Sequence, residues 1–379
     1  MKTLIHPFEE IQSFLDYHDY SLAVRRLLDM CLDSGNDELL REAIALSRLY
    51  RTYQPEQTEL PELKLQAEAL LQKLEHFTPA SHLNKMLLVA EDISKTYSGS
   101  RFSLQKLNLR ISTGDILGVV GENGNGKTTL LRCLAGQLAL DSGALHYPQL
   151  SKADHYAIKH HIAFIPQRIP RWYGQLKDNL HFSAAIAGIL GDKNRLMVDF
   201  MLERLNLTPY AELTWTQISS GYRTRFEIAR ILLQRPSLLI LDEPLANLDI
   251  NAQQTILTDL RYMAKSIYQP MGVILSSQQL HEVEKIADTV LFIKNGSCLF
   301  RTDDSVKQDS CVVEVETTIS RDELLQAFAA TEVSVSFNGG FYTIESTSLT
   351  VPELLSRLVN NNIPVSYFRD ITHSTKRFF

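Results

Sequence analysis

The sequence predicts an α/β protein in three parts: a helical segment over residues 1–84, a three-layer α/β domain over 85–305, and an α+β unit over 311–379. Three observations support this. Apolar residues in the first part recur at helical spacing, short apolar strands alternate with helices in the second, and the third has the element order βαββαβ. A chain of 379 residues is also long enough for two or three domains.

Composition excludes several classes of protein. No run approaches the ~18–20 apolar residues that span a bilayer, and no secretory signal opens the chain, so we expect a partner to supply any membrane role. A net charge of −6 and a pI near 6.0 give no general attraction for nucleic acid. Four scattered cysteines fit free thiols in a reducing cytosol: Cys31, Cys133, Cys298 and Cys311.

The first segment differs in charge from the rest of the chain. Residues 1–84 hold 8 basic and 14 acidic side chains, whereas the remainder is balanced. Periodicity predicts helices around 24–32 and 63–74, in a bundle of three or four helices. This bundle is interpreted either as a binding site for an unknown protein partner or as a passive stabilising cap. Breaks and a linker are predicted at Gly35-Asn36, Gln54-Pro55 and 78–81.

The last part is predicted from its turns. Strands at 333–337 and 341–344 flank Asn338-Gly339-Gly340, a strong hairpin signal. The other elements are a strand at 312–315, helices at 321–329 and 352–360, and a final strand at 363–368. Together they predict the split βαβ sandwich.

A phosphate-binding loop follows the buried strand 116–120. The sequence from Gly121 to Thr128 reads G-x4-G-K-T, and a helical stretch begins at Thr129. Glycines let the backbone wrap closely around phosphates, so that amide groups and a helix N-terminus face the anion. Lys127 supplies a charge to the β- and γ-phosphates, and the Thr128 hydroxyl is a ligand for Mg²⁺. We therefore predict binding of ATP and Mg²⁺ by the loop residues Gly121, Asn123, Gly124, Asn125, Gly126, Lys127, Thr128 and Thr129.

Two carboxylates end a second apolar strand, 238–241. Asp242 is placed to hold Mg²⁺, and Glu243, pointing to the other face of an extended chain, to polarise the attacking water. Without the upstream loop, a surface Asp-Glu turn before Pro244 would be the better interpretation.

A third segment carries a resemblance to a known family. Ile218-Ser219-Ser220-Gly221-Tyr222 and the helix after it resemble the LSGGQ signature of the ATP-binding cassette (ABC) ATPases, which are P-loop NTPases, over about residues 85–300. Ser219 and Gly221 match, whereas Ser220 and Tyr222 depart from the usual glycine and glutamine. Alone, the segment would pass for a helix capped by Ser219.

The resemblance implies further residue roles. Tyr97 resembles the aromatic residue that stacks on adenine, and Gln167 the glutamine that senses Mg²⁺. Residues 246–249 look like the loop that contacts the opposite cassette. In this family two cassettes pack head to tail, so Ser219 and Gly221 would act on ATP held by the partner's phosphate loop. A homodimer is the expectation.

One departure from the family affects catalysis. The family places a histidine after the sixth strand, in contact with the γ-phosphate, and here the frame puts Gln278 at that position. His281 lies one helical turn further on and is interpreted as a solvated residue. A glutamine cannot become cationic, which predicts hydrolysis slower by ~10–100-fold, with Glu243 and Lys127 still present.

The leading hypothesis is the ATPase subunit of an exporter-type transporter. It would lie in the cytoplasm, held at the inner face of the membrane by an integral permease subunit. Export is inferred from the βαββαβ unit, which resembles the accessory domain of exporter cassettes, with 367–371 packing back on the core. Trp172 and Tyr173 lie where the family meets its membrane subunit, although ordinary packing suits them equally. The alternative is a soluble ATPase, or an ATP-dependent switch, not coupled to transport.

Overall fold

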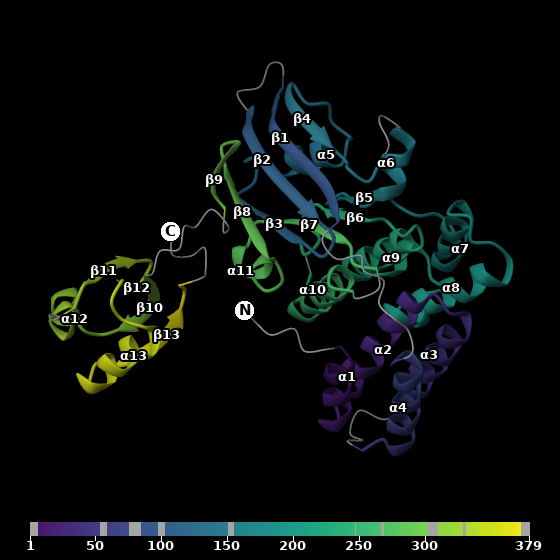
Figure 1. Ribbon diagram of the computed structural model, residues 1–379, viewed down its shortest axis with the longest axis horizontal. Helices are drawn as coiled ribbons and strands as arrows, with labels where there is room; N and C mark the ends of the chain where they lie inside the picture. Colours follow the sequence, from purple (N-terminus) through teal and green to yellow (C-terminus); the bar gives the residue numbers. More distant parts are fainter. Residues whose placement is uncertain are drawn as a thin grey trace. The chain divides into compact units, whose positions relative to one another are not determined.

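A computed structural model of the chain describes residues 7–53, 59–75, 85–97, 103–150, 155–246, 248–266, 269–301, 310–328 and 331–372 (Figure 1). Its contacts form two compact units. The first holds residues 1–288 and 292–299, and the second holds residues 289–291 and 300–379. In the described ranges, no helix combines the length and the apolar character that crossing a membrane requires.

Helices build the N-terminal segment, as the spacing of its apolar residues predicted. The Asp19 carboxylate accepts a hydrogen bond from the Leu22 amide at the start of the second helix, and Gly35 ends it in the left-handed conformation, at φ 67°. The predicted break at Gln54-Pro55 and the linker at 78–81 lie outside the described residues. The helices are α1 (Pro7–Asp16), α2 (Tyr20–Ser34), α3 (Asp37–Tyr50) and α4 (Pro61–Glu75).

A six-stranded sheet forms the centre of the first unit, in the order β5-β6-β7-β3-β8-β9. Neighbours among β5, β6, β7 and β3 pair in parallel, so the loops after these four strands meet at one edge. The strands are β3 (Ile116–Val120), β5 (Ile162–Ile165), β6 (Leu238–Leu241), β7 (Gly272–Ser277), β8 (Thr289–Lys294) and β9 (Ser297–Arg301).

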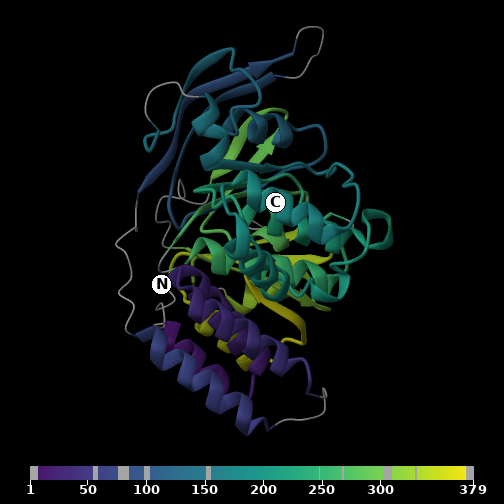
Figure 2. The same ribbon diagram turned by 90° about the vertical axis from the view of Figure 1, so that its right-hand side faces the viewer.

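Further layers surround this sheet. An antiparallel sheet in the order β2-β1-β4 lies at the opposite end of the unit from α1–α4 (Figures 1 and 2). It comprises β1 (Met86–Thr96), β2 (Ser103–Ser112) and β4 (Ser142–His146). The helices are α5 (Lys127–Leu134), α6 (His155–His161), α7 (Leu176–Ile186), α8 (Gly191–Arg204), α9 (Ser220–Leu232), α10 (Ile250–Ala264) and α11 (Leu280–Val283), with 3-10 turns at Thr208–Tyr210 and Trp215–Gln217.

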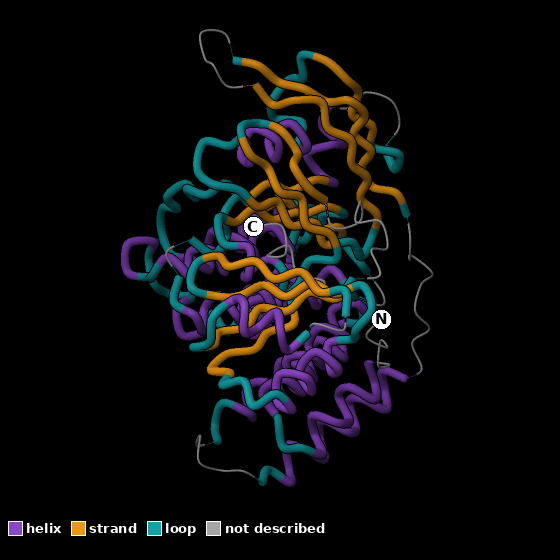
Figure 3. The backbone as a smooth tube through the Cα atoms, turned by 90° about the vertical axis from the view of Figure 1, so that its left-hand side faces the viewer, coloured by secondary structure: helices purple, strands orange, loops and turns teal. Residues whose placement is uncertain are grey.

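The N-terminal helices pack directly on the α/β layers. One continuous hydrophobic core joins their leucines to those of α7, α8 and α9. Ion pairs reinforce the contact: the Arg204 guanidinium of α8 lies 2.5 Å from the Asp29 carboxylate of α2, and both side chains are buried. Figure 3 shows this all-helical segment, drawn in purple like the other helices, beside the α/β layers. The contacts place residues 7–75 and the sheet in one compact unit. The boundary of a separate domain at residue 84 stays a prediction.

The second unit is a four-stranded antiparallel sheet with two helices, in the order β11-β12-β10-β13. Gly339 and Gly340 turn its hairpin at φ 58° and 93°. The last strand begins two residues later than predicted, because the Ile363 amide still donates to the Leu358 carbonyl and closes the preceding helix. The elements are β10 (Cys311–Thr317), α12 (Arg321–Ala327), β11 (Val333–Asn338), β12 (Phe341–Ser346), α13 (Val351–Asn360) and β13 (Val365–Asp370).

Candidate functional site

The phosphate loop leaves the sheet at the carboxyl end of β3 and enters α5. A Cβ atom at Gly121 would lie 2.3 Å from the Ile293 carbonyl oxygen, so only glycine fits this close approach. Gly126 adopts φ 104° immediately before α5 and allows the sharp turn into the helix. The helix N-terminus thus opens at the end of the loop, where its amide groups suit an anion.

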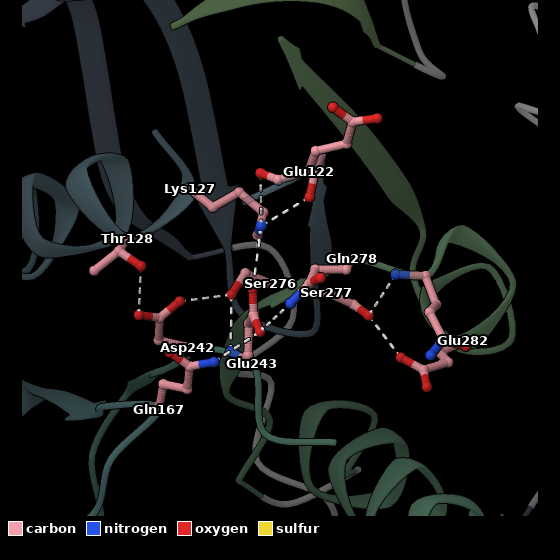
Figure 4. Close-up of polar contacts among 12 residues, drawn as sticks. Glu122, Lys127, Thr128, Gln167, Asp242, Glu243, Ser276, Ser277, Gln278 and Glu282 are labelled. Atoms are coloured by element: carbon pink, nitrogen blue, oxygen red, sulfur yellow. Dashed lines mark hydrogen bonds and ion pairs between the residues drawn. The ribbon is translucent and has the colours of Figure 1, made fainter. Parts of the chain in front are cut away.

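Lys127 is held in the mouth of this loop. Its Nζ donates to the Gly121 carbonyl at 2.7 Å and to the Glu122 carbonyl at 3.1 Å, and it lies 3.1 Å from Glu243 Oε1 (Figure 4). The residue is only 4% exposed. Three oxygen partners fix a buried positive charge at the place that the sequence predicted for phosphate.

Asp242 is anchored from both sides at the end of β6. Thr128 Oγ1 donates to Asp242 Oδ2 at 2.7 Å, and Ser276 Oγ donates to Asp242 Oδ1 at 2.8 Å. Ser276 also accepts a hydrogen bond from the Glu243 amide, at 2.8 Å. No motif in the sequence indicated a role for Ser276. The available signal was a pair of serines, Ser276 and Ser277, at the end of an otherwise apolar, fully buried strand, β7.

Glu243 gathers three donors on one carboxylate. Gln167 Nε2 lies 2.9 Å and Gln278 Nε2 lies 2.8 Å from Glu243 Oε2, while Lys127 faces Oε1. The expected extended backbone at Glu243, which would turn its side chain to the face opposite Asp242, is wrong, since its φ is 48° and the backbone turns there. This left-handed turn aims the carboxylate at the phosphate loop.

The donor set fits a magnesium ion. Thr128 Oγ1 and the Asp242 carboxylate are oxygen ligands already in contact, which is the ligand chemistry that Mg²⁺ prefers. The predicted third ligand, Gln167, comes from the loop after β5 and uses its amide nitrogen to bind Glu243, so only its oxygen remains for a metal. Substrate oxygens and water complete such sites in proteins.

The other predicted nucleotide-binding residues differ in burial and contacts. Asn125 is buried and its Oδ1 accepts a hydrogen bond from the Asn295 amide at 2.9 Å, which ties the loop to the turn between β8 and β9. Asn123 and Gly124 are exposed. Tyr97 Oη lies 3.4 Å from Thr129 Oγ1, so the predicted adenine-stacking ring stands beside the first turn of α5.

The signature segment begins helix α9. Ser219 occupies the N-cap position, but its side chain makes no capping hydrogen bond. Within the described part of the chain, it also makes no polar contact with the phosphate loop. Gly221 lies in the first turn of α9, against the side chains of Ala252 and Leu248. The structure therefore does not join Ser219 and Gly221 to the other predicted site residues within one chain.

Two other predictions can be compared with the structure. Trp172 is buried, not exposed, because it stacks on Trp215 with ring centroids 5.1 Å apart; Tyr173 is 80% exposed. His281 is exposed on α11, as predicted, whereas Gln278 reaches Glu243. Of the loop expected to meet the opposite cassette, Asn247 lies outside the described residues, and Asp249 caps α10 through the Ala252 amide.

Comparison with known proteins gives the family. A family model described as ABC transporter matches residues 104–246. The phosphonates import ATP-binding protein PhnC of Bdellovibrio bacteriovorus is 32% identical over 58% of this chain and 89% of its own length. This chain belongs to the ABC transporter family. It is the ATP-binding subunit of an ABC transporter, and it is an ATPase.

Other proteins similar to this ABC subunit support the same family assignment. The phosphonates import ATP-binding protein PhnC of Treponema denticola is 27% identical over 62% of this chain and 98% of its own. The solved structure of CbiO1 from Clostridium perfringens, part of the ABC transporter complex CbiONQ, has 25% identity and a TM-score of 0.52, covering 57% of this chain and 88% of that one.

Proposed function

We propose that this ABC subunit hydrolyses ATP·Mg²⁺ at two composite sites, formed when two copies pack head to tail. The observation that carries the proposal is the divided geometry. One edge of the sheet brings together Lys127, Asp242 and Glu243. The hydroxyl of Ser219, at the start of α9, makes no capping hydrogen bond. A serine hydroxyl that makes no capping bond among the described residues, at the start of a helix, suits the γ-phosphate bound by a second copy.

Each residue has a role that follows from its contacts. The loop amides and Lys127 bind the phosphates, and Thr128 with Asp242 holds the magnesium ion, assisted by Gln167. Glu243 accepts the proton of the attacking water, and Gln278 and Gln167 orient its carboxylate. Tyr97 stacks on the adenine ring. Ser276 keeps Asp242 and the Glu243 backbone in register.

The transporter around the subunit is also part of the proposal. An integral permease subunit would hold it at the cytoplasmic face of the membrane, with exposed Tyr173 in the contact. The βαββαβ order of residues 311–379 favours export, and we propose this unit as a separate accessory domain. The names of both PhnC relatives specify import and favour the opposite direction. Vesicles reconstituted with the permease decide the direction, because ATP supplied outside drives an exporter to accumulate substrate inside.

Mixing inactive variants tests the composite site. Lys127→Ala removes a phosphate-binding residue, and Ser219→Arg blocks the signature. Alone, each protein should be inactive. Mixed, about half of the dimers pair the two variants and carry one intact site of two, so about a quarter of the wild-type rate returns.

The matched control combines two changes on the same side of the site. Lys127 and Glu243 belong to one chain's half, so Lys127→Ala mixed with Glu243→Gln should restore nothing. Restoration in this control, or none in the first mixture, rules out the head-to-tail arrangement.

A further inference from the structure

A cavity of about 340 Å³ lies where helix α2 meets the edge of the sheet at which β5, β6 and β7 begin. Its lining comes from α2, from the end of α8 and from residues that directly precede these three strands. The phosphate loop and Glu243 follow the carboxyl ends of the strands, at the opposite edge. Pockets of this size bind small molecules in many proteins. The cavity is therefore a candidate binding site separate from the nucleotide site.

The lining of this cavity combines apolar side chains with a few charged ones. Arg204 of α8 and Asp29 of α2 are buried, whereas Arg235, just before β6, is exposed. A ligand with an apolar body and one charged group suits such a lining. Four of the apolar side chains are buried: Leu87, Leu232, Met263 and Met271.

The guanidinium of Arg204 retains an unused donor. Its Nε donates to Asp29 Oδ1 at 2.6 Å, and its Nη2 lies 2.5 Å from the same oxygen. The third nitrogen, Nη1, has no hydrogen-bond partner among the described residues, although the side chain is only 3% exposed. A buried donor without a partner costs free energy and requires an explanation. A guanidinium can bind one carboxylate on each of two edges, and Asp29 takes only the edge formed by Nε and Nη2.

The charges around the cavity favour an anion. The charge of Asp29 is balanced by its ion pair with Arg204, and Arg235 adds a positive charge on the exposed side. The Ser266 hydroxyl donates to Asp33 Oδ2. Burial raises the pKa of the Asp33 carboxyl to about 7, although the bond from Ser266 opposes this shift. A carboxyl that titrates near neutral pH can take up a proton beside a bound anion.

We propose that this cavity binds a small monocarboxylate with an apolar body, whose carboxylate accepts from the second edge of the Arg204 guanidinium and whose body contacts the buried leucines and methionines. One guanidinium edge matches the two oxygens of a carboxylate, whereas a phosphate dianion needs more donors. Such a ligand would join α2 to the cassette. The site goes beyond ATP hydrolysis and does not depend on the head-to-tail pairing proposed above.

Isothermal titration calorimetry with octanoate tests the proposal on the full chain. One octanoate should bind per chain. Octylamine and octanol have the same alkyl chain with a cation or with no charge, and each should bind at least about 10-fold more weakly. Arg204→Lys keeps a cation for Asp29 but lacks the second planar edge, so it should weaken octanoate binding by about 10-fold.

A second variant blocks the cavity without changing Arg204. Ser237 lines the cavity just before β6, and Ser237→Trp should abolish octanoate binding by filling that space. This variant keeps the test valid if Arg204→Lys does not fold. Two matched controls should bind octanoate like the parent: Arg230→Lys, in the ion pair with Glu227 on α9, and Ser356→Trp, at an exposed position on α13.

Three results would overturn the proposal. The first is a parent protein that does not bind octanoate, and the second is a parent that binds octylamine equally well. The third is octanoate binding that persists unchanged in both Arg204→Lys and Ser237→Trp, or that falls as much in the two controls. The measurement uses neither ATP nor a dimer, so a failure of the proposed function would leave its result intact.

Discussion

At the scale of single residues, the surroundings of Glu243 bear on the rate of ATP hydrolysis. The carboxylate of Glu243 is surrounded by one cation, Lys127, and two amides, Gln167 and Gln278. An amide donates a hydrogen bond but never carries the positive charge that imidazole can acquire. At the position where the family resemblance implies a γ-phosphate contact, the chain therefore carries a hydrogen-bond donor that stays neutral.

Restoring that charge should raise turnover. We expect Gln278→His to increase kcat by about 10–100-fold, since a charge-assisted bond to the transferring phosphoryl group is stronger than a neutral one. Steady-state release of inorganic phosphate measures kcat in both proteins. Gln279→His, at the neighbouring exposed position, is the control and should leave kcat unchanged. An unchanged rate in Gln278→His would show that some other group serves this role.

At the scale of elements, buried ion pairs hold the N-terminal helices on the cassette. Glu203 of α8 has a side chain only 1% exposed and accepts hydrogen bonds from Ser47 and Arg48 of α3 and from Arg51, which directly follows that helix. Removing one partner of a buried ion pair leaves the others desolvated and unpaired. This network explains why the helices and the sheet form one unit although their charge compositions differ.

Glu203→Ala should therefore destabilise the docked helices. Arg48 and Arg51 retain some access to water, so we expect a loss of about 2–4 kcal/mol in the free energy of unfolding, measured by urea denaturation. Glu212→Ala breaks the solvent-exposed pair with Lys177 and should cost at most about 1 kcal/mol. Equal losses in the two variants would mean that the α3–α8 contact contributes little.

At the scale of the whole molecule, local patterns predicted much of the fold and of the site. A pattern of a few neighbouring residues is enough to predict the phosphate loop, Asp242 after β6 and the hairpin at Gly339-Gly340. Contacts between residues far apart in the sequence could not be predicted in this way. Nothing near Trp172 in the sequence indicates the stacking partner that buries it, more than forty positions away, at Trp215.

The packing of the N-terminal helices on the α/β layers could not be predicted from the sequence for the same reason. The acidic surplus of residues 1–84 suggested a separate region, yet Asp29 of this segment pairs with Arg204 of the cassette. Likewise, Ser276 resembled an ordinary strand residue until its hydroxyl was found between Asp242 and the Glu243 amide. Only the fold shows which distant side chains share a buried site.

The proposed joining of two copies of this chain by ATP can be tested directly by one measurement. Light scattering of Glu243→Gln protein should give twice the 43.0 kDa chain mass with saturating ATP and magnesium, and a single chain mass with ADP. In the proposed head-to-tail pair, ATP bridges the two halves only while its γ-phosphate is present. A mass that stays at one chain with saturating ATP would contradict the account.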